Sequence, residues 1–349
     1  MNKTVNRRDF LRNASLLTVG GMLASTGCNA ASSSENSNAQ TTDRKNYGLQ
    51  IYSLAREVYQ GNIAENLKKV HDMGYSYLEM SGYNQENKSF GGDNYGRPVD
   101  GYALVPMADF KKMASDAGLE IRSSHLVPTN GSLRDANSAE NRVAISEWWK
   151  KAADHHAEIG IQMILQANMQ LASRNIPEVK RVCDTFNDAG KSAKEAGINW
   201  GFHNHSSEFA WISQDSENYT LTVRPPGSAG GGPGGQQQPS PYVMIQTEYI
   251  NNTDPSLVFF ELDVYWTVMG FQDPVEWLRN YPSRIQALHI KDRGVLGQSG
   301  MMNFEQIFKQ AYANNINHFF VELERVPSGT QFESVKACAD YLNAALFVR

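Results

Sequence analysis

The stretch Ala196-Gly197-Ile198-Asn199-Trp200-Gly201-Phe202-His203-Asn204-His205 contains the pattern that decides the fold. A helical pattern ends at Gly197, and an apolar run begins immediately after it. Glycine tolerates the left-handed backbone conformation that closes a helix, so the pattern predicts a helix-to-strand junction. The same junction recurs at Met73-Gly74-Tyr75, Ala117-Gly118-Leu119 and Ile159-Gly160-Ile161.

Eight apolar runs in the chain are predicted strands, and helical or mixed segments separate them. They cover residues 47–52, 75–80, 119–125, 161–166, 198–205, 258–265, 285–291 and 318–323. Repeated alternation of strand and helix predicts an α/β fold of the (β/α)8 TIM-barrel type. A doubly wound open sheet is the alternative. It lacks support because no Gly-x-Gly-x-x-Gly motif follows the first predicted strand.

The N-terminal residues carry export signals. Asn6-Arg7-Arg8-Asp9-Phe10-Leu11-Arg12 resembles a twin-arginine signal, and Ser25-Thr26-Gly27-Cys28 resembles a lipobox. We therefore expect a signal peptide over residues 1–28, lipid anchoring through Cys28 and a flexible tether over residues 29–46. A cleaved signal with an incidental cysteine is the alternative. Either reading places the mature protein in the periplasm or at the cell surface.

Residues 47–349 are expected to form a single barrel domain with one inserted loop. Between Pro225 and Pro241 the chain contains six glycines and five prolines, which predicts a loop at the carboxyl end of the fifth strand. The loop is either an active-site lid or a tolerated insertion. The formal net charge is −5 and the basic residues are scattered, which argues against nucleic-acid binding and against a polybasic membrane patch.

The last four predicted strands all carry acidic or histidine side chains near their carboxyl ends. Because an isolated buried charge is costly, a shared divalent metal is the simplest account of such residues at one end of a barrel. The predicted ligands are His203, Asp263, His289 and Glu322. Mixed nitrogen and oxygen ligands suit Mn²⁺, Co²⁺, Zn²⁺ or Fe²⁺, without selecting among them.

Several motifs resemble those of the sugar phosphate isomerase/epimerase family with the xylose-isomerase-like TIM barrel, which includes ketose 3-epimerases. They are Tyr47-Gly48-Leu49-Gln50-Ile51-Tyr52-Ser53-Leu54, Gly201-Phe202-His203-Asn204-His205-Ser206-Ser207-Glu208-Phe209, Phe260-Glu261-Leu262-Asp263-Val264-Tyr265-Trp266, Leu288-His289-Ile290-Lys291-Asp292 and Phe320-Val321-Glu322. The resemblance implies the same barrel and places metal ligands at Asp263, His289 and Glu322. The ketose epimerases have a glutamate, which also acts as acid/base, where this chain has His203.

This departure leaves the proton carriers open. Glu322 is a candidate ligand and base, and the other catalytic candidates are His203, His205 and Lys291. An ion pair of Lys291 with Asp292 or Glu261 is an equally good interpretation of that lysine. The expected substrate contacts are Glu79, His125, Glu208, Glu261 and Trp266.

The expected function is a metal-dependent sugar isomerase or epimerase that removes a proton next to a carbonyl. Export favours a non-phosphorylated sugar or keto-sugar as the substrate. One alternative is a lyase or hydratase of 3-keto-glycosides that acts by β-elimination. Another is a sugar-binding lipoprotein without catalytic activity.

Overall fold

The computed structural model describes residues 44–129, 139–167, 175–214 and 242–349. The predicted signal peptide, nearly all of the predicted tether and the predicted loop 225–241 lie outside these residues. The chain from Asp43 to Arg349 forms one compact unit. No helix among the described residues combines the length and the apolar character that a membrane span requires.

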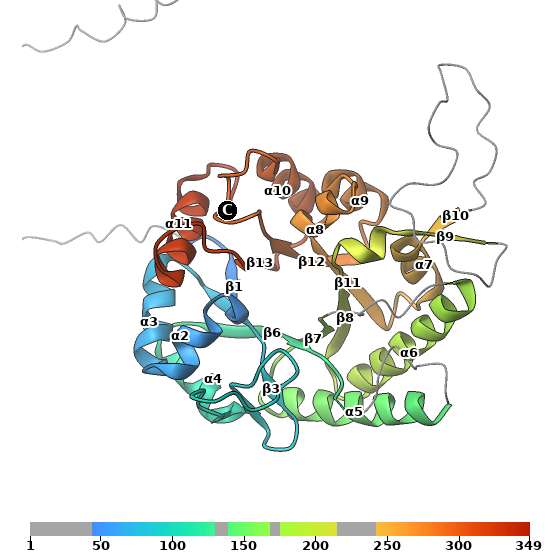
Figure 1. Ribbon diagram of the computed structural model, residues 1–349, viewed down its shortest axis with the longest axis horizontal. Coiled ribbons are helices and arrows are strands. Elements are labelled where there is room, and N and C mark those ends of the chain that lie inside the picture. Colours follow the sequence, from blue (N-terminus) through green and yellow to red (C-terminus); the bar gives the residue numbers. More distant parts are fainter. Residues whose placement is uncertain (1–43, 130–138, 168–174, 215–241) are drawn as a thin grey trace, which may run out of the picture. The chain divides into compact units, whose positions relative to one another are not determined.

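Eight strands form a closed barrel (Figure 1), as the strand-helix alternation predicted. They are β1 (Gly48–Gln50), β2 (Tyr77–Met80), β6 (Glu120–Leu126), β7 (Met163–Gln166), β8 (Asn199–His203), β11 (Val258–Asp263), β12 (Ile285–Ile290) and β13 (Phe319–Val321). The order around the barrel is β1-β13-β12-β11-β8-β7-β6-β2, and the strand pairs are parallel. The prediction of a TIM barrel is therefore confirmed, and the open-sheet alternative is excluded.

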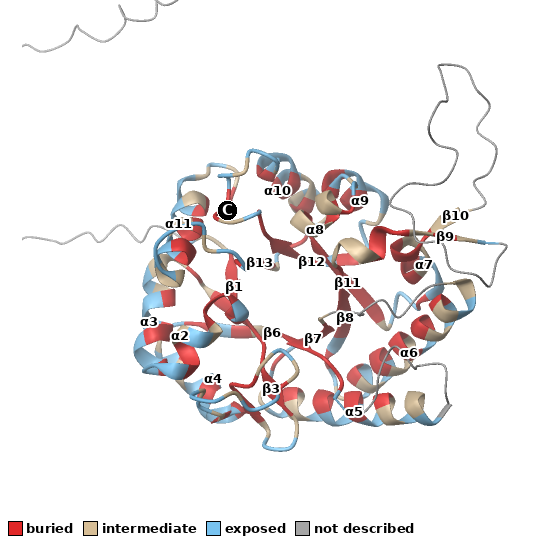
Figure 2. Ribbon diagram, viewed as in Figure 1, coloured by how far each residue is buried: buried red, intermediate tan, exposed pale blue. Residues whose placement is uncertain are grey.

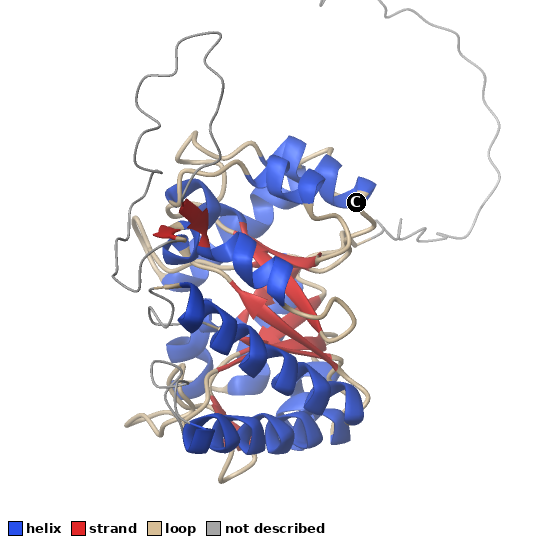
Figure 3. Ribbon diagram, turned by 90° about the vertical axis from the view of Figure 1, so that its right-hand side faces the viewer, coloured by secondary structure: helices blue, strands red, loops and turns tan. Residues whose placement is uncertain are grey.

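Helices surround the strands (Figure 3). They are α2 (Ala55–Gln60), α3 (Ile63–Met73), α4 (Met107–Asp116), α5 (Ala139–Glu158), α6 (Ile176–Glu195), α7 (Ile245–Asn252), α8 (Val264–Met269), α9 (Pro274–Asn280), α10 (Phe304–Ala313) and α11 (Gln331–Ala344). The four glycines after α3, α4, α5 and α6 all have positive φ angles, from 73° to 120°. This is the left-handed geometry that the sequence predicted for the helix-to-strand junctions.

Two small antiparallel sheets project from the connections between barrel strands. One contains β3 (Tyr83–Asn84), β4 (Ser89–Phe90) and β5 (Val105–Pro106), and lies between β2 and α4. The other pairs β9 (Trp211–Ser213) with β10 (Tyr242–Met244), so that Trp211 lies opposite Met244. This second pair joins the two ends of the segment that contains the predicted loop.

The interior of the barrel changes from apolar to polar along the strands. Side chains at alternate positions of a strand share one face, so Phe259, Glu261 and Asp263 of β11 point the same way. Phe259 belongs to a separate buried apolar cluster with five residues of four other strands, Tyr77, Met163, Leu165, Ala287 and Phe320. A side chain at Gly201 would collide with the Phe259 ring, because its Cβ would lie 2.6 Å from that ring. The polar residues follow toward the carboxyl ends of the strands. Nearly all residues of the barrel strands are buried, while the helices expose one side (Figure 2).

Five strands, β1, β8, β11, β12 and β13, end earlier than the sequence indicated, and local hydrogen bonds or caps account for the first three. After β1 the chain enters a 3-10 helix, η1 (Ile51–Leu54), because the Gln50 side chain accepts a hydrogen bond from the Tyr52 backbone N–H. β8 ends at His203, and His205 caps a second 3-10 helix, η3 (Ser206–Phe209). β11 ends at Asp263, whose side chain caps α8. The strand predicted over 198–205 is therefore shorter, and His205 lies outside it.

Candidate active site

Four buried side chains converge at the carboxyl end of the barrel. His203 ends β8, Asp263 ends β11, His289 lies in β12 and Glu322 follows β13. Each offers one ligand atom, and these atoms all lie within 4.8 Å of one another. His289 Nδ1 lies 3.3 Å from Glu322 Oε2 and 3.9 Å from Asp263 Oδ2. The structure thus brings together the four residues that the sequence predicted as metal ligands.

Asp263 provides the clearest test of whether this cluster fits a metal ion. Its Oδ1 accepts a hydrogen bond from the Trp266 backbone N–H at 2.7 Å. Its Oδ2 is buried and has no hydrogen-bond partner among the described residues. Burial raises the pKa of Asp263 to about 7. A buried carboxylate oxygen without a donor is costly, and a divalent cation would satisfy it. Two imidazoles and two carboxylates also form a suitable ligand set for such a cation.

Two further carboxylates lie deeper in the barrel and hold the imidazoles. Glu79 Oε1 lies 2.6 Å from His289 Nε2, and Glu261 Oε2 lies 2.7 Å from His125 Nε2 and 3.1 Å from His203 Nδ1. Glu79 also accepts hydrogen bonds from Gln50 Nε2 at 3.1 Å and Ser123 Oγ at 2.6 Å.

Both carboxylates are fully buried, and neither is among the described residues that line the cavity. Glu79 and Glu261, which we expected as substrate contacts, therefore lie outside the cavity lining.

Burial and neighbouring charges set the protonation of the imidazoles. Burial and the nearby imidazole of His289 lower the pKa of His203 well below its usual value, so His203 is neutral and suited to binding a metal. Burial alone would also favour neutral His125 and His289. Neighbouring carboxylates raise both pKa values instead. Glu79 and Glu261 act on His125, and Glu261 and Glu322 act on His289.

Lys291 forms the cationic edge of the site. Its Nζ lies 2.8 Å from Glu322 Oε2 and 2.5 Å from Glu324 Oε1, and it stacks 4.9 Å above the Trp266 ring. Although burial favours the neutral amine, these carboxylates raise the pKa of Lys291. Burial disfavours the charged carboxylate of Glu322, but Lys291 and His289 hold its pKa well below the usual range. Lys291 therefore pairs with Glu322 and Glu324, and neither Asp292 nor Glu261 is its partner.

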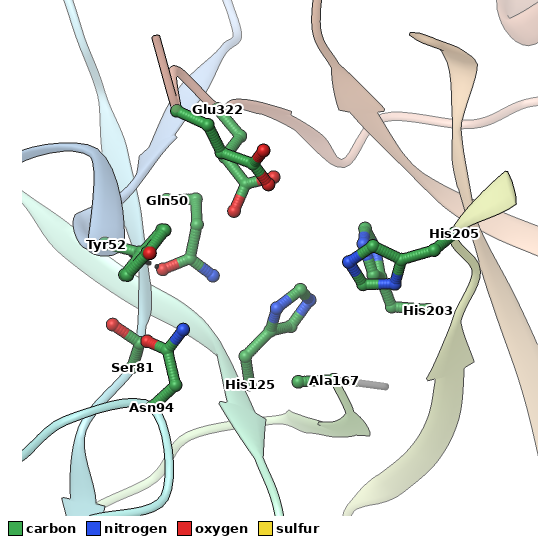
Figure 4. Close-up of a pocket in the computed structure, with 10 residues that line it drawn as sticks. Gln50, Tyr52, Ser81, Asn94, His125, Ala167, His203, His205 and Glu322 are labelled. Atoms are coloured by element: carbon green, nitrogen blue, oxygen red, sulfur yellow. Dashed lines mark hydrogen bonds between the residues drawn. The ribbon is translucent and has the colours of Figure 1, made fainter. Parts of the chain in front are cut away.

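A cavity opens in front of this cluster (Figure 4). It is lined by Gln50, Tyr52, Ser81, Asn94, His125, Ala167, His203, His205, Glu322 and Glu324. Figure 4 shows Glu322 on the same side as Gln50 and Tyr52, with His203 and His205 on the opposite side. A small ligand in the cavity would lie between a carboxylate and a pair of imidazoles.

Two predicted contacts lie outside this lining. The Glu208 carboxylate accepts hydrogen bonds from the His205 backbone N–H at 2.7 Å and from Ser207 Oγ at 2.8 Å, so it shapes the turn. Trp266 packs against Lys291 and His205, with ring centroids 5.7 Å apart in the second pair.

Sequence reasoning missed several residues of the lining: Gln50, Tyr52, Ser81, Asn94, Ala167 and Glu324. Glu324 could have been found, because it lies two positions after Glu322.

Solved structures share both the fold and much of the sequence of this chain. A crystal structure of a sugar phosphate isomerase/epimerase from Parabacteroides distasonis ATCC 8503 is 41% identical, with a TM-score of 0.76, over 89% of this chain and 100% of that chain. A second from the same organism is 44% identical, with a TM-score of 0.73, over 87% and 100% of the two chains. This chain belongs to the sugar phosphate isomerase/epimerase family.

More distant proteins resemble this family member in fold. The 3-keto-D-glucoside 4-epimerase of E. coli is 16% identical, with a TM-score of 0.59, over 86% of this chain and 100% of that chain. An L-ribulose 3-epimerase has the same identity and TM-score over 85% and 93% of the two chains. No family model and no curated protein matches the chain.

Proposed function

We propose that the protein is a metal-dependent isomerase or epimerase that removes a proton next to the carbonyl of a sugar or keto-sugar. The observation that carries this proposal is the buried set of His203, Asp263, His289 and Glu322, in which Asp263 Oδ2 lacks a hydrogen-bond partner. Membership of the sugar phosphate isomerase/epimerase family supports it.

A divalent cation held by these four residues would act as a Lewis acid on the sugar oxygens. The remaining chemistry belongs to the side chains. Lys291 keeps Glu322 ionised at neutral pH, so the Glu322 carboxylate can accept a proton from carbon. Such proton transfer typically contributes a factor of about 10² to 10⁴ in rate.

A change of stereochemistry at carbon needs a second proton carrier on the opposite face of the sugar. His205 lies across the cavity from Glu322 (Figure 4), and burial lowers its pKa, so its ring is neutral and able to accept or return a proton. The ketose epimerases, which the motifs resemble, use a glutamate at the position of His203. We propose that His203 acts here as a ligand and that His205 takes the second proton-transfer role.

The test is incubation of metal-loaded and metal-free protein with a panel of free sugars and 3-keto-glycosides in deuterated water, followed by NMR. The proposal predicts metal-dependent deuterium incorporation into an isomer or epimer. Release of an aglycone with an unsaturated or hydrated keto-sugar would indicate the lyase or hydratase instead. Binding without exchange in either substrate class would indicate the sugar-binding lipoprotein.

We also propose that the protein acts outside the cytoplasm and is anchored through Cys28, on the basis of its N-terminal motifs. In a host that has twin-arginine export and lipoprotein processing, wild-type protein should fractionate with membranes, and Cys28→Ala should move to the soluble exported fraction. A soluble wild-type protein would contradict the anchor, and retention in the cytoplasm would contradict the export signal.

A further inference from the structure

A second cavity lies between the loops that follow β12 and β13. Its volume is about 610 Å³, within the range of small-molecule sites. The residues relevant to its chemistry are Arg293, Gln298, Ser299, Met301, Arg325 and Pro327. Met301 is apolar yet 45% exposed. The cavity thus combines two cations with exposed apolar surface.

Neither guanidinium group in this cavity has an ion pair or a side-chain hydrogen bond within the described part of the chain. Other arginines, such as Arg97 and Arg142, form ion pairs with Asp93 and Asp188. The positive charge of Arg293 and Arg325 is therefore available to a ligand.

The carboxylates beside these arginines in the chain are engaged elsewhere. Asp292 accepts hydrogen bonds from the backbone N–H groups of Arg293 at 2.7 Å and Gly297 at 3.0 Å, which shapes the loop. Glu324 is bound by Lys291 at 2.5 Å. Both negative charges are thus already paired or used by the backbone, and the cavity keeps its two positive charges.

This cavity is close to the active site along the chain. Arg293 lies two residues after Lys291, and Arg325 lies three residues after Glu322. Since an extended chain covers at most about 3.6 Å per residue, the Cα atoms of these pairs are within about 7 Å and about 11 Å. Both loops also leave the barrel at the end where TIM barrels bind substrate.

We infer that this cavity is a subsite for an oxyanion, a carboxylate, sulfate or phosphate group carried by the sugar or by its aglycone. The guanidinium fork matches the geometry of such groups. Met301 and Pro327 supply apolar surface for the C–H face of a ring. The inference rests on the proposed function for the sugar itself and adds a charged substituent to the substrate.

The test compares the binding of D-glucuronate, D-glucose 6-phosphate and D-glucose to zinc-loaded protein by titration calorimetry at low and high salt. At low salt, at least one charged sugar should bind about tenfold or more tightly than glucose, and salt should reduce the difference. The charged sugar with the larger increase in affinity over glucose shows whether the cavity prefers a carboxylate or a phosphate group. Arg293→Gln/Arg325→Gln should abolish the preference and leave the affinity for glucose unchanged.

Arg279→Gln is the matched control, because Arg279 is an exposed arginine of α9 that hydrogen-bonds Gln310 at 3.2 Å. Equal affinity for charged and neutral sugars, no binding of any of the three, or an unchanged preference in the double variant would overturn the subsite. Binding is measured without turnover. Absence of proton exchange would thus contradict the proposed function without affecting an observed preference for charged sugars. Equal affinity for charged and neutral sugars would contradict the subsite without affecting the proposed proton abstraction.

Discussion

Glu79 and His289 are 210 positions apart in the chain, yet Glu79 Oε1 accepts a hydrogen bond from His289 Nε2 over 2.6 Å inside the barrel. An ionised carboxylate only accepts hydrogen bonds, so Nε2 carries the proton. The raised pKa of His289 places a second proton on Nδ1, the atom that faces Glu322 and Asp263, and loss of that proton to a bound cation would free the Nδ1 lone pair. Glu79 would thus orient His289 toward a metal ion held at the proposed site.

Glu79→Gln should therefore weaken metal binding without removing a ligand. Loss of a carboxylate that orients a metal-binding histidine typically costs 10- to 100-fold in affinity. The measurement is competition with a chelator of known affinity. Glu120→Gln is the control, because Glu120 is an exposed glutamate that pairs with Arg122 at the start of β6. Wild-type affinity in Glu79→Gln would rule out the orienting role.

His289→Ala should abolish tight metal binding. His289 lies between the two deep carboxylates, Glu79 and Glu261, and the proposed ligands Asp263 and Glu322, and alanine supplies no ligand atom in its place. Elemental analysis of purified protein should find about one divalent ion per wild-type chain and almost none in the variant. His71→Ala, in α3, is the control. Equal metal content in wild type and His289→Ala would contradict the assignment.

His156 should make the fold sensitive to acid, independently of the active site. It is fully buried, its Nδ1 donates to the Ala152 carbonyl at 2.7 Å, and its Nε2 has no partner among the described residues. Burial lowers its pKa from 6.5 to about 4. The unfolded chain therefore takes up this proton first, so stability is complete above pH 6.5 and is lost as the pH falls toward 4.

The loss amounts to about 3 kcal/mol for this group. Denaturant unfolding of His156→Gln between pH 7 and pH 4 should show a shallower dependence on pH than the wild type, whatever its stability at pH 7. Parallel curves for the two proteins would show that His156 does not contribute.

Replacement of residues 227–238 by a short Gly-Ser link should change the melting temperature little. The β9–β10 pair joins the two ends of the longer segment and lies outside the deletion. The entropy of closing a loop depends only weakly on its length. Calorimetry measures the melting temperature of the shortened protein. A changed substrate KM relative to wild type would indicate a lid, and an unchanged KM would indicate a tolerated insertion. Loss of the folded state would contradict the prediction that this segment is dispensable.

The barrel could be predicted because its signal is periodic and repeated. Helix-closing glycines such as Gly197 mark the junctions, and a polar residue after an apolar run marks the carboxyl end of a strand. The four predicted ligands follow from that rule. The depth of a residue within the barrel does not follow from that rule. The alternation predicts which face of the strand carries Glu261, but not how far Glu261 lies from the carboxyl end of the barrel.

The positions of residues in turns and loops could also not be predicted from the periodic pattern of the sequence. His205 continues the alternation of β8, but its backbone N–H donates to Glu208 and the chain turns into η3. Asn94 reaches the cavity from the connection between β4 and β5, where no periodic pattern exists. Such positions depend on contacts between distant segments.

The most direct test of the account is the rate at which Glu322→Gln exchanges a carbon-bound substrate proton with deuterated solvent. Glutamine is nearly the same size but cannot accept the proton. Metal content must be matched between variant and wild type, because Glu322 is also a predicted ligand. We predict metal-dependent exchange in the wild type and a rate at least about 10²-fold lower in the variant. Equal exchange rates at equal metal content would contradict the assignment of Glu322 as the base.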